Sequence, residues 1–180
     1  MSTEDPGDRW PTRQHERADW QPMATWVDRS LRFEQHGLTG NLWVRVAARG
    51  LTHVRIRLDR AGEQVIVLDD PDVPPPRVGL GLRAEGLWTE LICETPFEHW
   101  SYGLEAFALL VDDPDDAAWG DRVAFGWELE WETVGEGPVP DADRGGYHQE
   151  GGVTGIVLVG SDRIEIDGSG RRRHRWPPPA

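Results

Sequence analysis

Four side chains in the segment FEHWSYGLEAF, residues 97–107, could carry out chemistry on an apolar molecule: His99, Trp100, Tyr102 and Glu105. A carboxylic acid held between aromatic walls has its pKa raised by desolvation, and it can then protonate an alkene or a carbonyl. Neighbouring indole faces stabilise the cation that follows. Glu105 is therefore the candidate acid. The competing interpretation is a solvated or arginine-paired glutamate with a structural role.

The segment VAFGWELEWE, residues 123–132, adds Trp127 and Trp131 to this aromatic set. Its apolar residues share one parity and its glutamates share the other, which predicts a strand with one apolar and one acidic face. Tryptophans on such a face either pack a core or line a cavity that receives a ligand. We treat Trp100, Tyr102, Trp127 and Trp131 as candidate walls of a ligand site.

Period-two alternation also decides which elements position these residues. Turn-forming Gly, Pro, Asp and Ser residues separate the alternating segments, which is typical of an antiparallel barrel or sandwich. We therefore predict a single all-β domain. Its strands are expected at residues 41–48, 53–59, 63–70, 87–94, 100–111, 123–132, 152–160 and 162–168.

The two ends of the chain lack this alternation. Residues 1–22 combine Pro, Asp, Arg and Gln without a period, and residues 169–180 are rich in Arg and Pro, so we predict disordered tails flanking a domain at 23–168. Residues 26–33, WVDRSLRF, place their apolar side chains loosely on one helical face. They are the one segment for which we expect a short helix.

The charge balance limits the kinds of partner. The chain has 32 Asp+Glu against 19 Lys+Arg, a formal net charge of −13, so a nucleic-acid partner is not expected. The lone Cys93 cannot form an internal disulfide. No apolar run approaches the ~20 residues of a membrane span. With no signal-peptide pattern at its start, the chain is expected to be cytoplasmic.

Most catalytic motifs are absent from the sequence. There is no phosphate-binding Gly-rich loop, no G-x-S-x-G elbow, no H-E-x-x-H and no cysteine pair, and the histidines are scattered singly. We therefore expect no metal site and no cofactor.

The order of the C-terminal segments resembles the proteins related to carotenoid hydratase (hydroxyneurosporene synthase) and AttH, whose members are double-lipocalin-like. The resemblance covers residues 85–176 and is strongest in GGYHQEGGVTG and in IEIDGSGRRRHRW. By this resemblance Tyr147 and Gln149 match a Y-x-Q pair, while His174 and Trp176 match an H-x-W pair that faces the cavity. The H-x-W motif is degenerate, because Arg173 stands in place of an acidic residue.

The resemblance implies a lipocalin-like barrel or curved β-sandwich that binds a hydrophobic isoprenoid-, polyketide- or steroid-like molecule. Hydration or cyclisation without a cofactor would use Glu105 and His174, and Arg173 and Arg175 are expected to lower the pKa of His174. By the same resemblance, the chain is expected to correspond to the N-terminal half of such a protein, with a truncated C-terminus. It is therefore expected to self-associate or to pair with a separate lipocalin-like partner. The alternative interpretation is a non-catalytic structural or interaction module whose aromatic residues simply pack the core.

Overall fold

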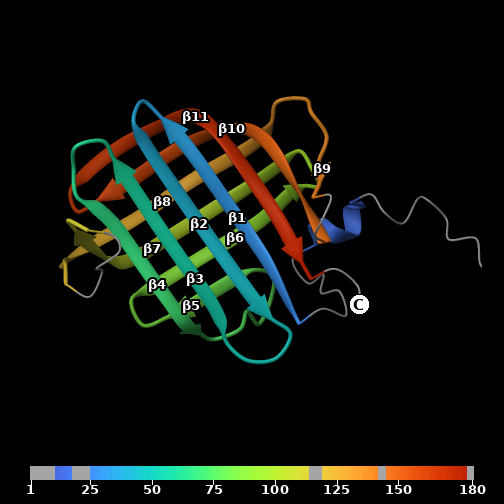
Figure 1. Cartoon of the computed structure of the whole chain (residues 1–180), viewed down its shortest axis with the longest axis horizontal. Helices are drawn as coiled ribbons and strands as arrows, with labels where there is room; N and C mark the ends of the chain where they lie inside the picture. The colour runs from blue at the N-terminus through green and yellow to red at the C-terminus, as the bar shows by residue number, and fades with distance from the viewer. Residues whose placement is uncertain (1–10, 18–24, 114–118, 142–144, 178–180) are drawn as a thin grey trace, which may run out of the picture.

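The computed structural model describes residues 11–17, 25–113, 119–141 and 145–177, which form an 11-stranded antiparallel sheet and one short 3-10 helix (Figure 1). The elements are η2 (Arg13–Glu16), β1 (Trp26–Gln35), β2 (Leu38–Ala47), β3 (Thr52–Arg60), β4 (Val65–Val73), β5 (Gly81–Ala84), β6 (Leu87–Thr95), β7 (His99–Val111), β8 (Asp121–Thr133), β9 (Val139–Pro140), β10 (Gly145–Val159) and β11 (Asp162–Trp176). The prediction of an all-β antiparallel barrel is confirmed, and the strand predicted at 100–111 is β7.

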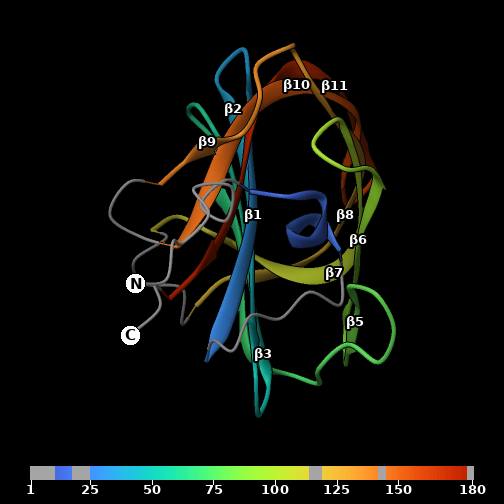
Figure 2. The same ribbon diagram turned by 90° about the vertical axis from the view of Figure 1, so that its right-hand side faces the viewer.

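The sheet closes on itself because one edge of β7 serves two partners. Residues 99–106 of β7 pair with β6, whereas its last residues pair with β4, from Val65↔Val111 to Val67↔Leu109. The other edge of β7 pairs with β8. Strands β1–β4 cross in front of β6–β8, and the long β10 and β11 arch from one layer to the other (Figures 1 and 2).

The barrel interior is filled by the inward-facing residues of these alternating strands. Phe33 lies opposite Gly40, where an added Cβ would come within 2.1 Å of the ring, so glycine is needed at this position. Trp127 packs edge-on against Phe33 and Phe125, with ring centroids 5.9 and 5.4 Å apart. Trp127 therefore belongs to the packed core.

The helix predicted at 26–33 is wrong, because these residues belong to β1. Val27, Arg29, Leu31 and Phe33 alternate inward, and β1 pairs with β2 on one side and β11 on the other. The buried Arg29 interrupts the apolar alternation that would have marked the strand in the sequence. The backbone N–H and C=O groups of this segment form hydrogen bonds with both neighbouring strands, and a short isolated helix would be less stable than this arrangement.

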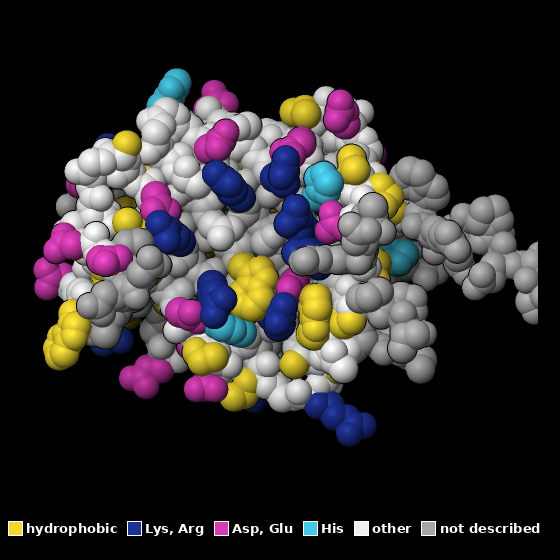
Figure 3. Space-filling view, in the orientation of Figure 1, with side chains coloured by type: hydrophobic (Ala, Val, Ile, Leu, Met, Phe, Trp, Pro, Cys, Tyr) yellow, Lys and Arg dark blue, Asp and Glu magenta, His cyan; other side chains and the backbone are white. Residues whose placement is uncertain are grey.

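The predicted C-terminal tail is also corrected. Residues 169–176 complete β11 and pair with both β1 and β10. Their basic composition hides a strand alternation: Arg172 and His174 point inward, whereas Arg171, Arg173 and Arg175 lie on the outer face. That outer face carries interspersed basic and acidic side chains (Figure 3). One ion pair on it joins Arg175 Nε to Asp141 Oδ2 at 3.6 Å.

The predicted N-terminal tail is partly described. Residues 11–17 are ordered against the barrel and include the buried Glu16, so this part of the prediction is wrong. These residues lie against the barrel because the Glu16 carboxylate accepts hydrogen bonds from side chains in its interior. Residues 1–10 and 18–22 of that tail, and residues 178–180 of the C-terminal one, lie outside the described residues.

Candidate functional site

An open cleft of about 880 Å³ lies at the end of the barrel where β1 begins and β2 ends. Its apolar walls come from Val27, Val46, Leu80, Leu91 and Ile92. Helix η2 borders the cleft and sits between the two layers of strands (Figure 2). The volume falls in the range of about 300–1,000 Å³ that small-molecule pockets usually have.

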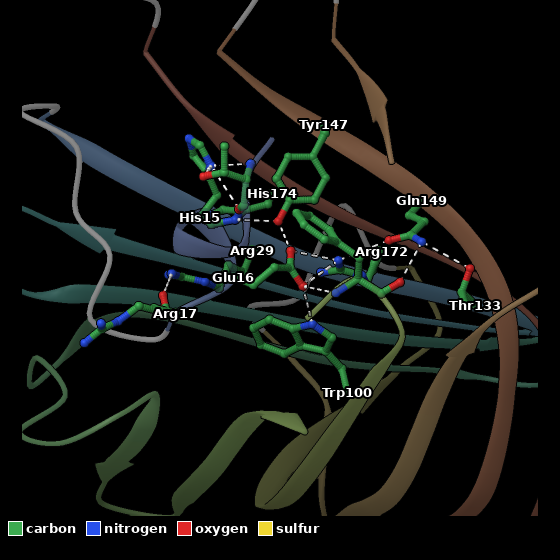
Figure 4. Close-up of polar contacts among 12 residues, drawn as sticks. His15, Glu16, Arg17, Arg29, Trp100, Thr133, Tyr147, Gln149, Arg172 and His174 are labelled. Carbon is green, nitrogen blue, oxygen red and sulfur yellow. Dashed lines mark hydrogen bonds and ion pairs between the residues drawn. The ribbon is translucent and has the colours of Figure 1, made fainter. Parts of the chain in front are cut away.

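Glu16 borders this cleft, and its side chain is 0% exposed. One carboxylate oxygen accepts a hydrogen bond from the Tyr147 hydroxyl and another from Arg172 Nη2, at 2.8 Å. The other accepts Arg172 Nη2 at 2.7 Å, Trp100 Nε1 at 2.7 Å and the backbone N–H of Phe97 at 3.2 Å. Figure 4 shows Tyr147, Trp100 and Arg172 converging on Glu16. A buried carboxylate is tolerated because all of its acceptor sites are used.

Arg172 is the cation of this cluster. Its guanidinium lies 4.9 Å from the ring centroid of Trp131, 5.3 Å from that of Trp100 and 5.6 Å from that of Tyr147. Arg172 also donates to Gln149 Oε1 at 3.2 Å. Aromatic faces and hydrogen bonds thus replace the water that the guanidinium lost on burial.

The turn before β7 is shaped to join this cluster. Phe97 has a φ of 66°, a left-handed conformation that is costly for a residue with a side chain. In this conformation its N–H bonds Glu16, while its carbonyl accepts Gln149 Nε2 at 2.8 Å. Gln149 therefore holds the turn and Arg172 in one hydrogen-bonded unit.

His174 extends the cluster through Tyr147. The Tyr147 hydroxyl proton is committed to Glu16, so the 3.2 Å contact between Tyr147 and His174 Nδ1 requires Nδ1–H to donate. Burial, followed by the charges of Arg29 and Arg172, holds the pKa of His174 well below its usual value. The predicted lowering is confirmed, but Arg29 and Arg172 are its charged sources rather than Arg173 and Arg175. At neutral pH His174 is an uncharged imidazole.

Arg29 is a second buried cation beside the cleft, with 6% of its surface exposed. Its Nη2 donates to the carbonyl of Arg17 at 3.2 Å, while its Nε has no hydrogen-bond partner among the described residues. Burial lowers the pKa of Arg29 to about 10, and the nearby Glu16 opposes that shift. Arg29 therefore remains charged at neutral pH.

Two more ionisable groups interact electrostatically with Glu16, Arg29 and Arg172. Burial raises the pKa of the Cys93 thiol to about 11, with Glu16 as the next cause, and burial also raises the pKa of Tyr102. Both groups are protonated and neutral near pH 7. Glu16, Arg29 and Arg172 are then one negative and two positive charges, so the cluster carries a net positive charge.

The structure brings most of the sequence-predicted site residues together, but not Glu105. Trp100, Tyr102, Trp131, Tyr147, Gln149 and His174 are buried on the inner face of their strands. Trp176 is half-buried and stacks on His15, with ring centroids 5.3 Å apart. Glu105 has the opposite parity on β7 and is exposed on the outer face, so the desolvated acid predicted there is not found.

Glu105 instead borders a second, outer groove of about 670 Å³ over β6, β7, β8 and β10. Phe107 and Leu158, which are 56% and 46% exposed, give this groove an apolar floor. Arg83, Arg163 and Glu128 also line it. The groove is therefore separate from the interior cluster.

Sequence reasoning missed Glu16, Arg29 and Arg172. Arg29 and Arg172 occupy inward positions of β1 and β11 in the period-two pattern, a signal that the sequence carries. Glu16 lies outside any strand, and no pattern in the sequence marks it.

Among the described residues, no group of three or more His, Cys, Asp or Glu could hold a metal ion. No helix in the same part of the chain is long and apolar enough to span a membrane.

No family of known proteins matches the chain, and no curated protein matches its sequence. A crystal structure of CghA with Sch210972 superposes with a TM-score of 0.42 at 11% sequence identity, over 84% of this chain and 46% of that one. The chain thus spans about half the length of CghA. Membership of the carotenoid hydratase-like and AttH-like family stays a prediction.

Proposed function

We propose that this protein binds a small hydrophobic molecule, isoprenoid-, polyketide- or steroid-like, in the cleft at the end of the barrel. The supporting observation is a cleft of about 880 Å³ that has an aliphatic wall and is bordered by the buried Glu16 and Arg29. An apolar wall with a few convergent polar groups is the usual composition of a small-molecule site. The polar groups would fix the orientation of the ligand, and the aliphatic wall would supply the affinity.

Hydration or cyclisation of the ligand, if it accompanies binding, would use interior groups. His174, Tyr147 and Glu16 form a continuous hydrogen-bonded chain along which a proton could move. Trp100 and Trp131 lie beside this chain with their rings against the Arg172 guanidinium, so this part of the interior already accommodates positive charge. All of these groups belong to the protein, so the proposal needs no cofactor.

The binding site is tested with two matched substitutions. Ile92, 42% exposed, lines the cleft, whereas Leu158, 46% exposed, lines the outer groove. Binding of the methyl ester of cis-parinaric acid is measured by quenching of tryptophan fluorescence. Ile92→Glu should weaken binding at least about tenfold by placing a charge against the apolar chain, and Leu158→Glu should leave it unchanged. The reverse result, or no binding to the unmodified protein, would refute the proposal.

A second candidate function is association through the outer groove, which fits the alternative of an interaction module. We propose a second copy of this chain as the occupant. The groove has an apolar floor and carries both Glu128 and the two arginines Arg83 and Arg163, so a two-fold contact can place opposite charges across the interface. Sedimentation velocity should show a dimer that Leu158→Glu dissociates and Ile92→Glu does not. A monomer at all concentrations would exclude this function.

A further inference from the structure

The barrel contains a complete receptor for a carboxylate. Arg172, Trp100, Tyr147 and the Phe97 backbone supply its donors, and all four come from β7, β10, β11 and the turn before β7. The carboxylate itself comes from Glu16, in the segment 11–17. The donors therefore belong to the barrel wall, whereas the acceptor is delivered by a short segment that lies against it.

Segment 11–17 meets the barrel through side chains. Glu16 enters the receptor, His15 stacks on Trp176, and the Arg17 carbonyl accepts Arg29 Nη2 at 3.2 Å. The backbone hydrogen bonds of this segment among the described residues are internal, within the single turn of η2. One turn of 3-10 helix has little stability of its own, so the segment keeps its place by these contacts.

The charge of the receptor exceeds what Glu16 neutralises. Arg172 and Glu16 form an ion pair with an N–O distance of 2.7 Å, whereas no carboxylate among the described residues forms an ion pair with Arg29. Arg29 is buried, borders the cleft, and has an Nε without a hydrogen-bond partner in the described part of the chain. A buried cation in this position favours an anion that arrives through the cleft.

We propose that the ligand of the cleft is an amphiphile with a carboxylate head, and that this head replaces the Glu16 carboxylate in the receptor. The inference rests on the proposed function and adds the ligand class and its control. Glu16 borders the cleft, so an apolar chain lying on Leu91 and Val46 can place its head where Glu16 now sits. Segment 11–17 is then a plug whose carboxylate competes with the ligand. Arg29, which borders the same cleft, adds positive charge near the incoming head.

The competition predicts a gain of affinity when Glu16 is weakened. Glu16→Gln keeps the side-chain shape but removes the charge that Arg172 pairs with. Because the side chain at position 16 then binds the receptor less strongly, it competes less with the ligand. The affinity for cis-parinaric acid should therefore rise about tenfold or more. The affinity for its methyl ester should stay within about twofold. Glu90→Gln is the matched control, because Glu90 lines the same cleft outside the receptor.

Four outcomes are distinguishable. A gain for the acid in Glu16→Gln that Glu90→Gln lacks supports the inference. Ester binding with no such gain refutes the inference and leaves the proposed function standing. An equal gain in both variants reduces the effect to general charge and also refutes the inference. No binding of acid or ester by any of these proteins refutes the proposed function, and the inference falls with it.

A second measurement tests the receptor without a long-chain ligand. Glu16→Ala removes the CH2–COO⁻ part of the side chain and leaves a space that acetate can fill. Acetate should raise the melting temperature of Glu16→Ala, whereas acetamide, of similar shape but uncharged, should not. The unmodified protein should respond to neither, because Glu16 occupies the receptor. Equal effects of acetate and acetamide on Glu16→Ala would refute a carboxylate receptor.

Discussion

Replacing Tyr147 with Phe should destabilise the fold although it removes one oxygen atom. The Tyr147 hydroxyl donates to the Glu16 carboxylate and accepts from His174 Nδ1, and the residue is 0% exposed. A hydrogen bond to a charged acceptor contributes about 1.5–3 kcal/mol, and the buried His174 donor left without its acceptor adds about 1 kcal/mol. We therefore expect Tyr147→Phe to lower the free energy of unfolding by about 2.5–4 kcal/mol.

The chain contains its own control for this substitution. It has two tyrosines, and the hydroxyl of Tyr102, which is also buried, forms no hydrogen bond with another described residue. Tyr102→Phe should change the free energy of unfolding by less than about 0.5 kcal/mol. Urea unfolding followed by tryptophan fluorescence measures both variants. Equal losses, or a neutral Tyr147→Phe, would show that the interior cluster does not hold Glu16 as described.

Two further predictions concern pH and packing. Because the pKa of His174 is lowered in the folded state, the unfolded chain binds a proton below about pH 6.5 that the native state does not. The contribution of His174 to stability is therefore complete above that pH and falls by up to about 1.4 kcal/mol per pH unit below it. Between neutral pH and about pH 5, the His174→Gln variant should therefore lose less stability than the unmodified protein does. The same pH profile of stability for both proteins would contradict this prediction. Gly40→Ala should cost about 1–3 kcal/mol in chemical denaturation, because its Cβ would overlap Phe33, whereas Gly152→Ala, whose nearest neighbour is 4.0 Å away, should cost clearly less.

The sequence predicted the fold well because alternation of apolar and polar residues directly reports which face of a strand is buried. β7 and β8 carry uninterrupted alternation and were predicted almost to their ends. β1 and the end of β11 were not, because Arg29, Arg172 and His174 occupy inward positions where an apolar residue would have completed the pattern. Glu105 was misplaced because its residue type suggested chemistry while its parity already pointed outward.

The positions at which the alternation is interrupted, Arg29, Arg172 and His174, are also residues of the candidate site. A sequence departs from local consistency where function requires a residue that the fold alone would not select. Glu16 was beyond prediction for another reason: its burial depends on a partner set spread from Phe97 to Arg172, and no local pattern encodes a contact over that separation.

Stability alone does not account for the interior charges. Apolar residues of similar volume usually stabilise a core at least as well as a buried ion pair does, and a buried cation outside an ion pair is more costly still. Glu16 and Arg172 form an ion pair, but Arg29 adds a positive charge at the wall of the cleft. A barrel that needed only a packed interior would place an aliphatic side chain at that position, as it does with Leu31 on the same strand. The excess positive charge is what a receptor for an anionic ligand requires, and in our proposal the head of that ligand takes the place of the Glu16 carboxylate.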